Sequence, residues 1–291
     1  MADAPPIIAA SRTVRVGLIG AGIGESRSPA LHEREAASLG FDLRYGLIDL
    51  VALGVGPDAL PDLLAAAEAD GLAGVNVTHP CKQSVIPLLD DLSPDARALG
   101  AVNTVVFRAG RRIGHNTDWS GFAESFRRGL PGAALGSVVQ LGAGGAGAAV
   151  GHAAMVLGAR RLAIFDVDGG RADRLAEALA RRFPNRRVTA GGDLAATLAV
   201  ADGLIHATPT GMAAHPGLPL SPALLAPRHW LAEIVYFPLE TALLAAARRI
   251  GCRTMDGGGM AVFQAVEAFR LFTAREPDAE RMLRHFRSMG S

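Results

Sequence analysis

Three features of the sequence predict an α/β protein with two domains. Apolar strand-like runs alternate with helical patterns throughout the chain, and repeated βα units imply sheets of parallel strands covered by helices. The alternation falls into two series, with a boundary near residues 117–121. The chain has 291 residues, of which 49% are hydrophobic, so it is long enough to bury a substantial core.

The first series contains strands, helices and one hairpin. Ser28 is a good N-cap and Pro29 a good first-turn residue, so we expect a helix to begin there. The turn Arg108-Ala109-Gly110 between two strand-like runs indicates the hairpin. We expect strands at 14–19, 44–50 and 74–77, helices at 28–39, 57–70, 80–89 and 121–130, and hairpin strands at 102–107 and 112–116.

The second series has short apolar runs with helical patterns between them, and two helices close the chain after Gly257-Gly258-Gly259. We expect strands at 137–141, 162–166, 188–190, 204–207 and 230–235. We expect helices at 148–157, 171–183, 239–251, 260–273 and 277–289.

The composition argues against several classes of protein. Lys and Arg (29) nearly balance Asp and Glu (28), so no basic surface predicts nucleic acid as a partner, and aromatic residues at 5% argue against base stacking. The two cysteines, Cys81 and Cys252, are too far apart for a disulfide scaffold or a cysteine-rich zinc site, which fits a reducing cytoplasm. No histidine motif predicts a metal site, and no apolar run reaches the roughly 20 residues of a membrane helix. Residues 1–12 lack the regions of a signal peptide.

The chain contains 28 arginines but a single lysine, Lys82. Surface charge is the ordinary role of a lysine, but a lysine amine differs from a guanidinium because its surroundings can make it lose its proton near neutral pH. Three of the four asparagines lie in polar clusters at 76–78, 103–104 and 116–118. Turns and caps explain most asparagines, yet three clusters within 43 residues around Lys82 favour a shared polar pocket.

Lys82 and Asp118 are the candidate acid–base pair. We expect Lys82 in the first turn of the helix at 80–89, where the positive end of the helix dipole disfavours an ammonium. Asp118 would be unremarkable as the N-cap of the next helix, but beside Lys82 it would hold the amine and balance its charge. Oxidation of an alcohol by hydride transfer needs a group that takes the hydroxyl proton. His79 and His115 are neighbouring candidates, but alternation places them on the opposite faces.

Two glycine-rich turns compete as a dinucleotide-binding loop. Residues 20–25 follow a strand, but their third glycine falls one position early. Gly142-Ala143-Gly144-Gly145-Ala146-Gly147 fits GxGxxG between a strand and a helix, which is the context the motif requires. Gly142 would allow the tight turn, Gly144 the approach of the pyrophosphate and Gly147 close helix–strand packing, with the phosphates on the helix N-terminus. The alternative is an ordinary βα turn.

Cofactor choice depends on the end of the next strand, where an acid is expected. Asp166 stands there, and its carboxylate would accept both ribose hydroxyls and repel a 2′-phosphate. This favours NAD over NADP. Arg171, one turn onward, would hold a phosphate, so NADP use stays open.

Three further polar residues are candidate substrate ligands. Ser26 and Ser28 would bind a carboxylate because two hydroxyls at a helix N-terminus favour an anion; capping alone explains Ser28 but does not require Ser26. Met260 and Gln264 lie on one helix face, four residues apart. A core-facing stripe is the simpler explanation of this pair, whereas a functional role would place Gln264 on substrate hydroxyls.

Taken together, these residues resemble the shikimate dehydrogenases, and most closely the NAD-linked quinate/shikimate dehydrogenases of bacteria. The resemblance extends from Val16 to about Phe286. In the first series it rests on Ser26-x-Ser28-Pro29, Asn76-Val77-Thr78-x-Pro80-x-Lys82, Gly100-Ala101-Val102-Asn103-Thr104 and Asn116-Thr117-Asp118-x-x-Gly121-Phe122. In the second it rests on the 142–147 loop, Ala207-Thr208-Pro209-x-Gly211-Met212, Tyr236-x-Pro238-x-x-Thr241 and Met260-x-x-x-Gln264.

The resemblance implies a substrate-binding domain of residues 1–118 plus 257–291 and a Rossmann-like NAD-binding domain of residues 119–256. Lys82 would be the general base during oxidation, with Asp118 as its partner. The resemblance implies that the carboxylate binds Ser26 and Ser28 and that the ring hydroxyls bind Asn76, Thr78, Asn103 and Gln264. Tyr236 would border the substrate, and the ribose and nicotinamide would contact Ala207, Thr208, Ile234 and Gly257.

The chain departs from the family pattern at several positions. Asp166-Val167-Asp168 stands where the biosynthetic NADP enzymes usually carry Asn-Arg-Thr, which counts against NADP. His206 replaces an asparagine, Glu233 replaces an aspartate and Phe237 replaces a polar residue. Ala261 stands where leucine is common, and the smaller side chain would leave room for the extra hydroxyl of quinate.

We therefore expect a cytoplasmic NAD-dependent enzyme that interconverts quinate with 3-dehydroquinate and shikimate with 3-dehydroshikimate. We expect small-molecule substrates and no metal, nucleic acid or membrane as a partner. A homodimer is compatible with the sequence. Two alternatives stay open. One is a biosynthetic NADP-dependent shikimate dehydrogenase, and the other is a nucleotide-responsive binding protein on the same fold, which would need neither Lys82 nor Asp118.

Overall fold

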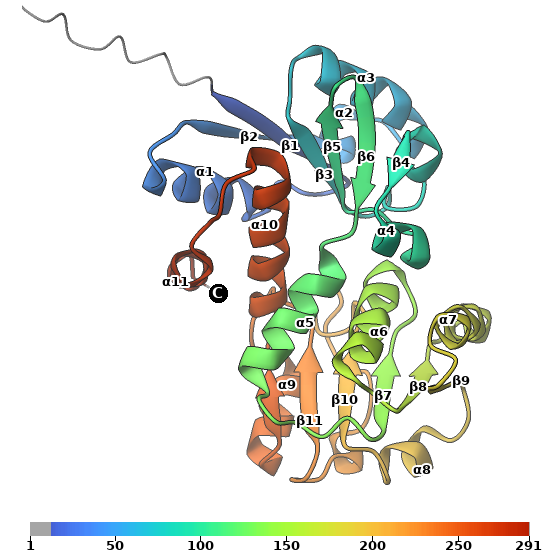
Figure 1. Cartoon of the computed structure of the whole chain (residues 1–291). Helices are drawn as coiled ribbons and strands as arrows, with labels where there is room; N and C mark the ends of the chain where they lie inside the picture. The colour runs from blue at the N-terminus through green and yellow to red at the C-terminus, as the bar shows by residue number, and fades with distance from the viewer. Residues whose placement is uncertain (1–12, 291) are drawn as a thin grey trace, which may run out of the picture.

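The computed structural model describes residues 13–290, and within them the chain forms two six-stranded sheets that lie one above the other in Figure 1. The segment 1–12, where no signal peptide is expected, lies outside the described residues. No helix among residues 13–290 combines the length and apolarity needed to cross a bilayer.

The first sheet has the strand order β2-β1-β3-β5-β6-β4. β1 (Val14–Gly20), β2 (Leu43–Asp49) and β3 (Gly74–Val77) are parallel, and β4 (Asp91–Leu92) pairs in parallel with β6. β5 (Thr104–Arg108) and β6 (Arg111–His115) form the antiparallel hairpin that the turn at 108–110 predicted. The loops after β1 and β3 meet, because the Ala21 N–H donates to the His79 carbonyl at 2.9 Å.

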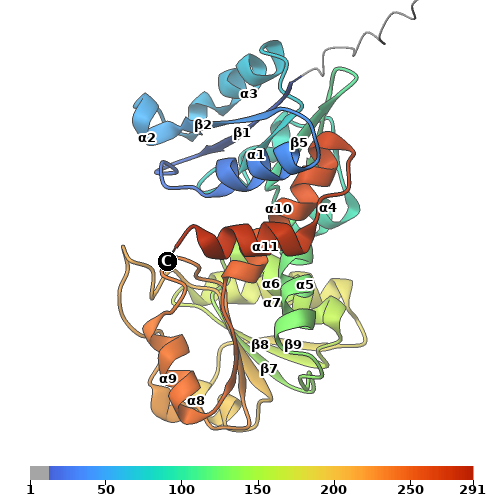
Figure 2. The ribbon, with the colours of Figure 1, turned by 90° about the vertical axis from the view of Figure 1, so that its left-hand side faces the viewer.

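Helices cover both faces of this sheet. α1 (Ser28–Ser38) lies on one face, while α2 (Leu50–Leu53) and α3 (Leu60–Ala69) lie on the other (Figure 2). A 3₁₀ turn at Pro57–Ala59 precedes α3. α4 (Pro94–Leu99) follows β4 and is capped by Ser93, whose hydroxyl accepts the Ala96 N–H at 3.2 Å.

The second sheet is entirely parallel, with the order β12-β11-β10-β7-β8-β9. Its strands are β7 (Val138–Leu141), β8 (Arg161–Phe165), β9 (Arg187–Ala190), β10 (Gly203–His206), β11 (Trp230–Glu233) and β12 (Arg253–Met255). The connecting helices are α6 (Gly145–Leu157), α7 (Gly169–Arg182), α8 (Leu194–Leu198) and α9 (Ala242–Ile250). This is the doubly wound order in which the topology reverses between the first and fourth strands, here β7 and β10, so the predicted Rossmann-like domain is confirmed.

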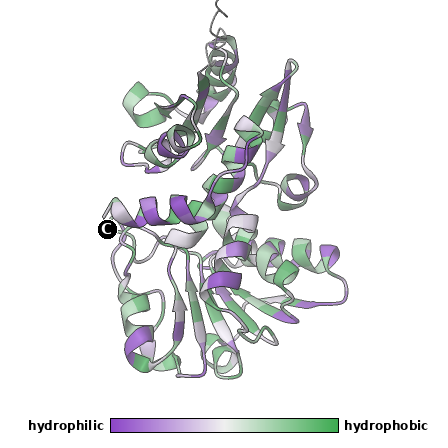
Figure 3. Ribbon diagram, turned by 60° about the vertical axis from the view of Figure 1, so that its left-hand side comes forward, coloured by the Kyte–Doolittle hydropathy of each residue, from purple (hydrophilic) through white to green (hydrophobic). Residues whose placement is uncertain are grey.

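Three helices join the two halves of the molecule, the first half containing the first sheet and the second half the second sheet. α5 (Asp118–Gly129) and α10 (Gly258–Thr273) pack together between the sheets, and α11 (Ala279–Ser288) packs on α10 and α1. At Gly121 a Cβ would lie 2.7 Å from the Gln264 backbone nitrogen, so only glycine allows this approach. α11 has an apolar side with Met282 and Phe286 buried, and it alternates purple and green in Figure 3.

The C-terminal helices return to the first sheet, as predicted. Phe269 and Phe272 of α10 share one hydrophobic cluster with Val16 and Leu18 of β1. A Cβ on Gly74 would lie 2.3 Å from the Val105 carbonyl oxygen and 2.7 Å from the Phe272 ring, so glycine lets the helix lie directly on the strand. Arg281 of α11 also pairs with the buried Glu35 of α1 at 2.6 Å.

One predicted helix is wrong. Residues 80–85 form turns rather than an α-helix, and a short 3₁₀ helix follows at Ile86–Leu88. Pro80 and Pro87 have no N–H to donate, and the segment alternates bonds to the third and fourth preceding residue, such as Val85 to Cys81 and Ile86 to Gln83. The helix dipole that the 80–89 helix was expected to direct at Lys82 is therefore absent. The sequence also did not predict α2, α4, α8, β4 and β12, all of which are short.

Candidate active site

Lys82 Nζ lies 2.6 Å from Asp118 Oδ2, so the pair joins the turns after β3 to the start of α5. The two side chains are only 22% and 10% exposed. Lys82 sits in the turns after β3, and its carbonyl accepts the Val102 N–H at 2.8 Å. Asp118 begins α5, and its own N–H donates to Asn116 Oδ1 at 3.1 Å. Two segments that are 36 residues apart thus bring the predicted pair together.

Asn103 holds the other oxygen of Asp118. Its Nδ2 donates to Asp118 Oδ1 at 2.9 Å and to Thr117 Oγ1 at 3.0 Å, while its Oδ1 accepts the Thr117 N–H at 2.8 Å. Asn103 is buried. Because these bonds fix both ends of the amide, the carboxylate of Asp118 is aimed before any ligand arrives.

A second buried network surrounds Asn76 at the end of β3. Tyr45 donates its hydroxyl to Asn76 Oδ1 at 2.8 Å, and Asn76 Nδ2 donates to Thr104 Oγ1 at 2.9 Å. Burial raises the pKa of Tyr45, and a hydrogen bond with the Ser28 side chain partly opposes that shift. The phenol therefore stays protonated at neutral pH and acts as a donor. Tyr45 is one of two tyrosines in the chain, but no motif in the sequence marks it as a site residue.

Ser26 lies on the loop after β1 and Thr78 on the loop after β3, while Ser28 is the first residue of α1 and not its N-cap, which is Arg27; each of the three is half-buried. Ser26 Oγ accepts the Ser28 N–H at 3.3 Å, which satisfies an amide at the start of α1. The Thr78 N–H donates to the Ile19 carbonyl at 2.9 Å. All three candidates thus follow the carboxyl ends of the parallel strands β1 and β3, as Lys82 does.

Two further candidates, Gln264 and Tyr236, come from α10 and from the segment after β11. Gln264 of α10 has its Oε1 3.4 Å from Thr117 Oγ1. Tyr236 follows β11 and is 46% exposed. Burial raises its pKa, and among the surrounding charges Lys82 and Arg27 lower it while Asp118 raises it. Lys82, Asp118 and Arg27 are thus the charges that act on the Tyr236 phenol.

The glycine-rich loop at 142–147 has the backbone that a dinucleotide requires. Gly142 has a φ of +99°, and a Cβ there would lie 2.3 Å from the Ala207 carbonyl oxygen. A Cβ on Gly147 would lie 2.3 Å from the Gly142 carbonyl oxygen, whereas a Cβ on Gly144 would meet nothing within 4 Å. The middle glycine therefore faces open space at the start of α6, and the outer two are needed by the protein itself.

The loop also adjoins the lysine. A Cβ placed on Gly145 would lie 3.9 Å from Lys82 Cδ. The only lysine thus runs beside the candidate phosphate cradle, although the two segments belong to different sheets.

Asp166 follows β8 at the rim of this loop. Its Oδ2 accepts the Ala143 N–H at 2.7 Å and its Oδ1 accepts the Asp168 N–H at 2.9 Å. Each carboxylate oxygen has a further lone pair for a ribose hydroxyl. Arg171 is paired with Asp168 at 3.2 Å. The residues present therefore fit an adenosine ribose without a 2′-phosphate.

The other glycine-rich turn is closed by the protein itself. The two oxygens of Asp49 accept the Gly22 N–H at 2.8 Å and the Ile23 N–H at 2.9 Å. α1 begins only at Ser28, so residues 20–25 do not open a helix.

The remaining candidates lie at the carboxyl ends of β10 and β11. Ala207 and Thr208 follow β10, and Ile234 follows β11. A Cβ on Gly257 would lie 2.4 Å from the Ile234 carbonyl oxygen, so Gly257 packs directly on this strand end. Ligands of doubly wound sheets bind at this edge.

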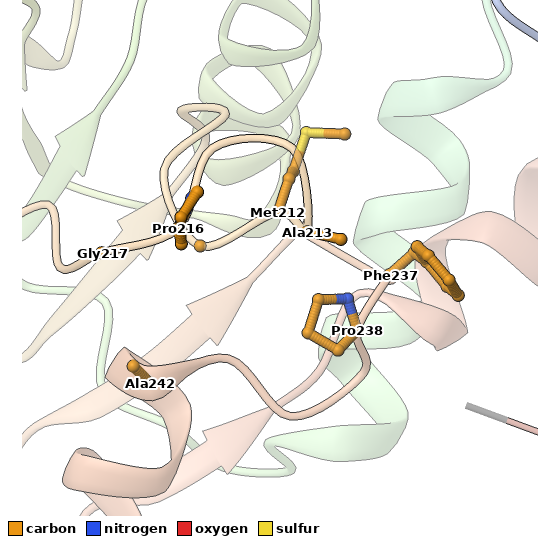
Figure 4. A pocket seen from close by; sticks show the side chains of 8 residues that line it. Met212, Ala213, Pro216, Gly217, Phe237, Pro238 and Ala242 are labelled. Carbon is orange, nitrogen blue, oxygen red and sulfur yellow. The ribbon is translucent and has the colours of Figure 1, made fainter.

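An apolar pocket of about 410 Å³ lies next to these strand ends. Figure 4 shows Met212, Phe237 and Pro238 among its lining residues. It contains none of the predicted site residues, so the chemistry is better located by the polar contacts. Within residues 13–290, no group of three His, Cys, Asp or Glu side chains is arranged to hold a metal ion.

Comparison with known proteins gives two family matches and many close relatives. Residues 18–105 match the shikimate dehydrogenase substrate binding domain, and residues 257–285 match the shikimate 5′-dehydrogenase C-terminal domain. A shikimate dehydrogenase (NADP(+)) of Streptomyces avermitilis is 62% identical over 92% of this chain and 93% of its own. A quinate/shikimate dehydrogenase (NAD(+)) of Corynebacterium efficiens is 47% identical over 95% of this chain and 99% of its own.

Solved structures agree with these matches. Quinate dehydrogenase from Corynebacterium glutamicum in complex with NAD superposes with a TM-score of 0.89, at 47% identity, covering 95% of this chain and 99% of that chain. A shikimate dehydrogenase in complex with NADP+ gives a TM-score of 0.87 at 30% identity, covering 96% of each chain. The chain therefore belongs to the shikimate dehydrogenase family.

Proposed function

We propose that this protein is an NAD-dependent quinate/shikimate dehydrogenase. It interconverts quinate with 3-dehydroquinate, and shikimate with 3-dehydroshikimate, by hydride transfer from one ring hydroxyl. The observation that carries this proposal is the largely buried Lys82–Asp118 pair, 2.6 Å apart, with Lys82 beside Gly145 of the glycine-rich loop. A protein that only binds a nucleotide has no use for such a pair.

Lys82 acts as the general base in the direction of oxidation. A bound NAD would supply the nicotinamide that accepts the hydride. As hydride leaves the carbon, the hydroxyl proton passes to the unprotonated Lys82 amine, and in reduction the Lys82 ammonium returns it. Asp118, fixed by Asn103 at 2.9 Å, orients the amine and balances the charge that it gains.

The substrate side supplies hydroxyls and amides. In this proposal Ser26 and Ser28 bind the substrate carboxylate, and Tyr236 borders the ring. The ring hydroxyls bind Asn76, Thr78, Asn103 and Gln264. The networks around Asn76 and Asn103 hold these amides in fixed orientations, and a ring hydroxyl that accepts from either amide would replace one of its present protein partners.

In this proposal the cofactor is bound by backbone groups and by one acidic side chain. The diphosphate binds the 142–147 loop, the adenosine ribose binds Asp166, and the nicotinamide half contacts Ala207, Thr208, Ile234 and Gly257. Asp166 favours NAD because a carboxylate repels a 2′-phosphate. Arg171 pairs with Asp168 at 3.2 Å, but this pair is exposed and weak, so Arg171 stays a candidate ligand for a phosphate and NADP use stays open.

A second candidate is an NADP-linked shikimate dehydrogenase. The name of the 62% identical relative from Streptomyces avermitilis favours it, whereas the NAD-linked relatives are 47% identical. Overall identity does not decide cofactor choice, because one side chain at the ribose is enough to change it.

Three coarser proposals complete the description. We propose that residues 1–118 plus 257–291 form the substrate-binding domain and that residues 119–256 form the cofactor-binding domain. We propose a cytoplasmic location. We also propose that the enzyme forms a homodimer.

A steady-state assay tests the proposed function. Quinate and shikimate are each combined with NAD⁺ and with NADP⁺, and NADH or NADPH formation is followed at 340 nm, a wavelength at which only the reduced nicotinamides absorb. Turnover of either acid with a higher kcat/KM for NAD⁺ supports the proposal. A higher kcat/KM for NADP⁺ selects the second candidate, and ligand binding without turnover contradicts both.

A further inference from the structure

A fully buried histidine–glutamate pair joins the carboxyl ends of two neighbouring strands. His206 ends β10 and Glu233 ends β11, and His206 Nδ1 lies 2.9 Å from each carboxylate oxygen. Both side chains are 0% exposed. Burying ionisable groups is costly unless their hydrogen bonds are satisfied, so the contacts of this pair indicate what it does.

Glu233 collects four donors. Its Oε1 accepts the N–H groups of Ile234 and Val235, both at 3.0 Å, and its Oε2 accepts the Thr241 hydroxyl at 3.0 Å. Nδ1 of His206 is the fourth donor. One carboxylate therefore fixes the path of the chain directly after β11, in the segment that leads to Tyr236.

His206 extends the same network to β10. Its Nε2 lies 2.6 Å from Thr208 Oγ1, which also accepts the Thr210 N–H at 3.3 Å. One ring nitrogen of His206 thus bonds the Glu233 carboxylate, and the other bonds the Thr208 hydroxyl. The ring therefore sets the position of the Thr208 hydroxyl, whose oxygen also accepts the Thr210 N–H.

The segments that this pair fixes line the candidate cofactor site. Ala207, between His206 and Thr208, has its carbonyl oxygen 2.3 Å from where a Cβ on Gly142 would lie. The carbonyl oxygens of Ile234 and Val235 lie 2.4 Å from where a Cβ on Gly257 would lie. The pair therefore sits behind the two backbone segments that face the glycine-rich loop and the start of α10.

We propose that His206 and Glu233 are positioning residues for the nicotinamide half of the cofactor. They set the Thr208 hydroxyl and the Ile234–Val235 backbone, and because both are buried they act through these groups without touching a ligand. This inference rests on the proposed function, because it assigns a device to the same cofactor site.

The test is direct binding of NADH, followed by the change in its fluorescence. His206→Ala leaves Glu233 short of a donor and is expected to raise the NADH Kd about tenfold. The KM for NAD⁺ rises with it, while the KM for the acid substrate changes little. His229→Ala is the matched control: His229 is also buried and accepts the Ala226 N–H at 3.1 Å, but it precedes β11 at the opposite end of the strand. Its NADH Kd is expected to equal that of the wild type.

Two conservative variants keep the test decisive if His206→Ala does not fold. His206→Asn places an amide nitrogen near the Nδ1 position and keeps a donor for Glu233, whereas His206→Gln reaches only toward Thr208. The inference requires a lower NADH Kd in His206→Asn than in His206→Gln. Equal values, an unchanged Kd in His206→Ala, or the same rise in His229→Ala would overturn it. Failure of the wild type to bind NADH would instead contradict the proposed function.

Discussion

The two halves of the molecule prepare their ligand sites in different ways. In the first half, side chains hold side chains: Asn103 aims Asp118, and Tyr45 aims Asn76. In the second half, the 142–147 loop presents backbone groups to the ligand. A Cβ would clash with the protein at two of its glycines, and at Gly144 it would extend into open space. A substitution in the first half should therefore change the chemical step or the affinity for the acid substrate. A substitution in the second half should change how well the cofactor fits against the backbone.

The largest expected effect concerns Lys82. Lys82→Met keeps the apolar stem beside Gly145 but removes the amine, so kcat should fall by about 10²–10⁴-fold, as for other positioned acid–base groups. The NADH Kd, measured by fluorescence, should stay at the wild-type value. Near-normal turnover in this variant would remove Lys82 from the mechanism.

Two glycines of the 142–147 loop allow the effect on cofactor binding to be separated from the effect on protein stability. Gly142→Ala introduces a Cβ 2.3 Å from a carbonyl oxygen at a φ of +99°, so the free energy of unfolding should fall by about 3 kcal/mol. Gly144→Ala meets no protein atom within 4 Å, so thermal unfolding should hardly change while NADH binds more weakly. If Gly144→Ala bound NADH like the wild type, the cradle would not face the diphosphate.

Acid stability should depend on His32 in the first half. This buried imidazole contacts Tyr45, Phe269 and Phe272, and burial lowers its pKa from 6.5 to about 3. Between those values the unfolded chain binds a proton that the folded chain does not, so stability falls as the pH falls from 6.5 toward 3. His32→Phe should reduce the loss between pH 6.5 and 5 by about 2 kcal/mol, measured by urea unfolding at both pH values. Equal losses in the two proteins would contradict this assignment.

The smallest expected effect is on cofactor preference. Asp166→Ala removes the charge that repels a 2′-phosphate, and the ratio of kcat/KM for NAD⁺ over NADP⁺ should fall about tenfold, equivalent to about 1.4 kcal/mol. Asp173→Ala removes an exposed acid of α7 and is the matched control, with no change expected. If the ratio of kcat/KM for NAD⁺ over NADP⁺ were unchanged in Asp166→Ala, the carboxylate would not discriminate between the two adenosine riboses.

The sequence predicted what depends on short stretches of chain. The 142–147 loop, the acid that follows the next strand and the βα alternation are each contained within about one supersecondary unit, so the second sheet and its cradle could be predicted. The same local reasoning correctly set aside the turn at 20–25, which Asp49 closes from 27 residues away.

Long-range contacts could not be predicted in the same way. The helix expected at 80–89 failed because Pro80 and Pro87 interrupt the donors, so the position of Lys82 comes from turns and from Val102. Tyr45 looked like an ordinary strand residue, because its partner Asn76 lies 31 residues onward. His206 and Glu233 were visible only as departures from a pattern, since their pairing requires two strands to be adjacent in the sheet.

A double-variant cycle on the pair at the centre of the site tests this account most directly. The kcat of the wild type, Lys82→Met, Asp118→Asn and the combined variant is measured with one acid and NAD⁺. If Asp118 acts through the Lys82 amine, the combined variant should be no slower than Lys82→Met alone. Losses that multiply, with Asp118→Asn slowing an enzyme that already lacks the amine, would contradict it.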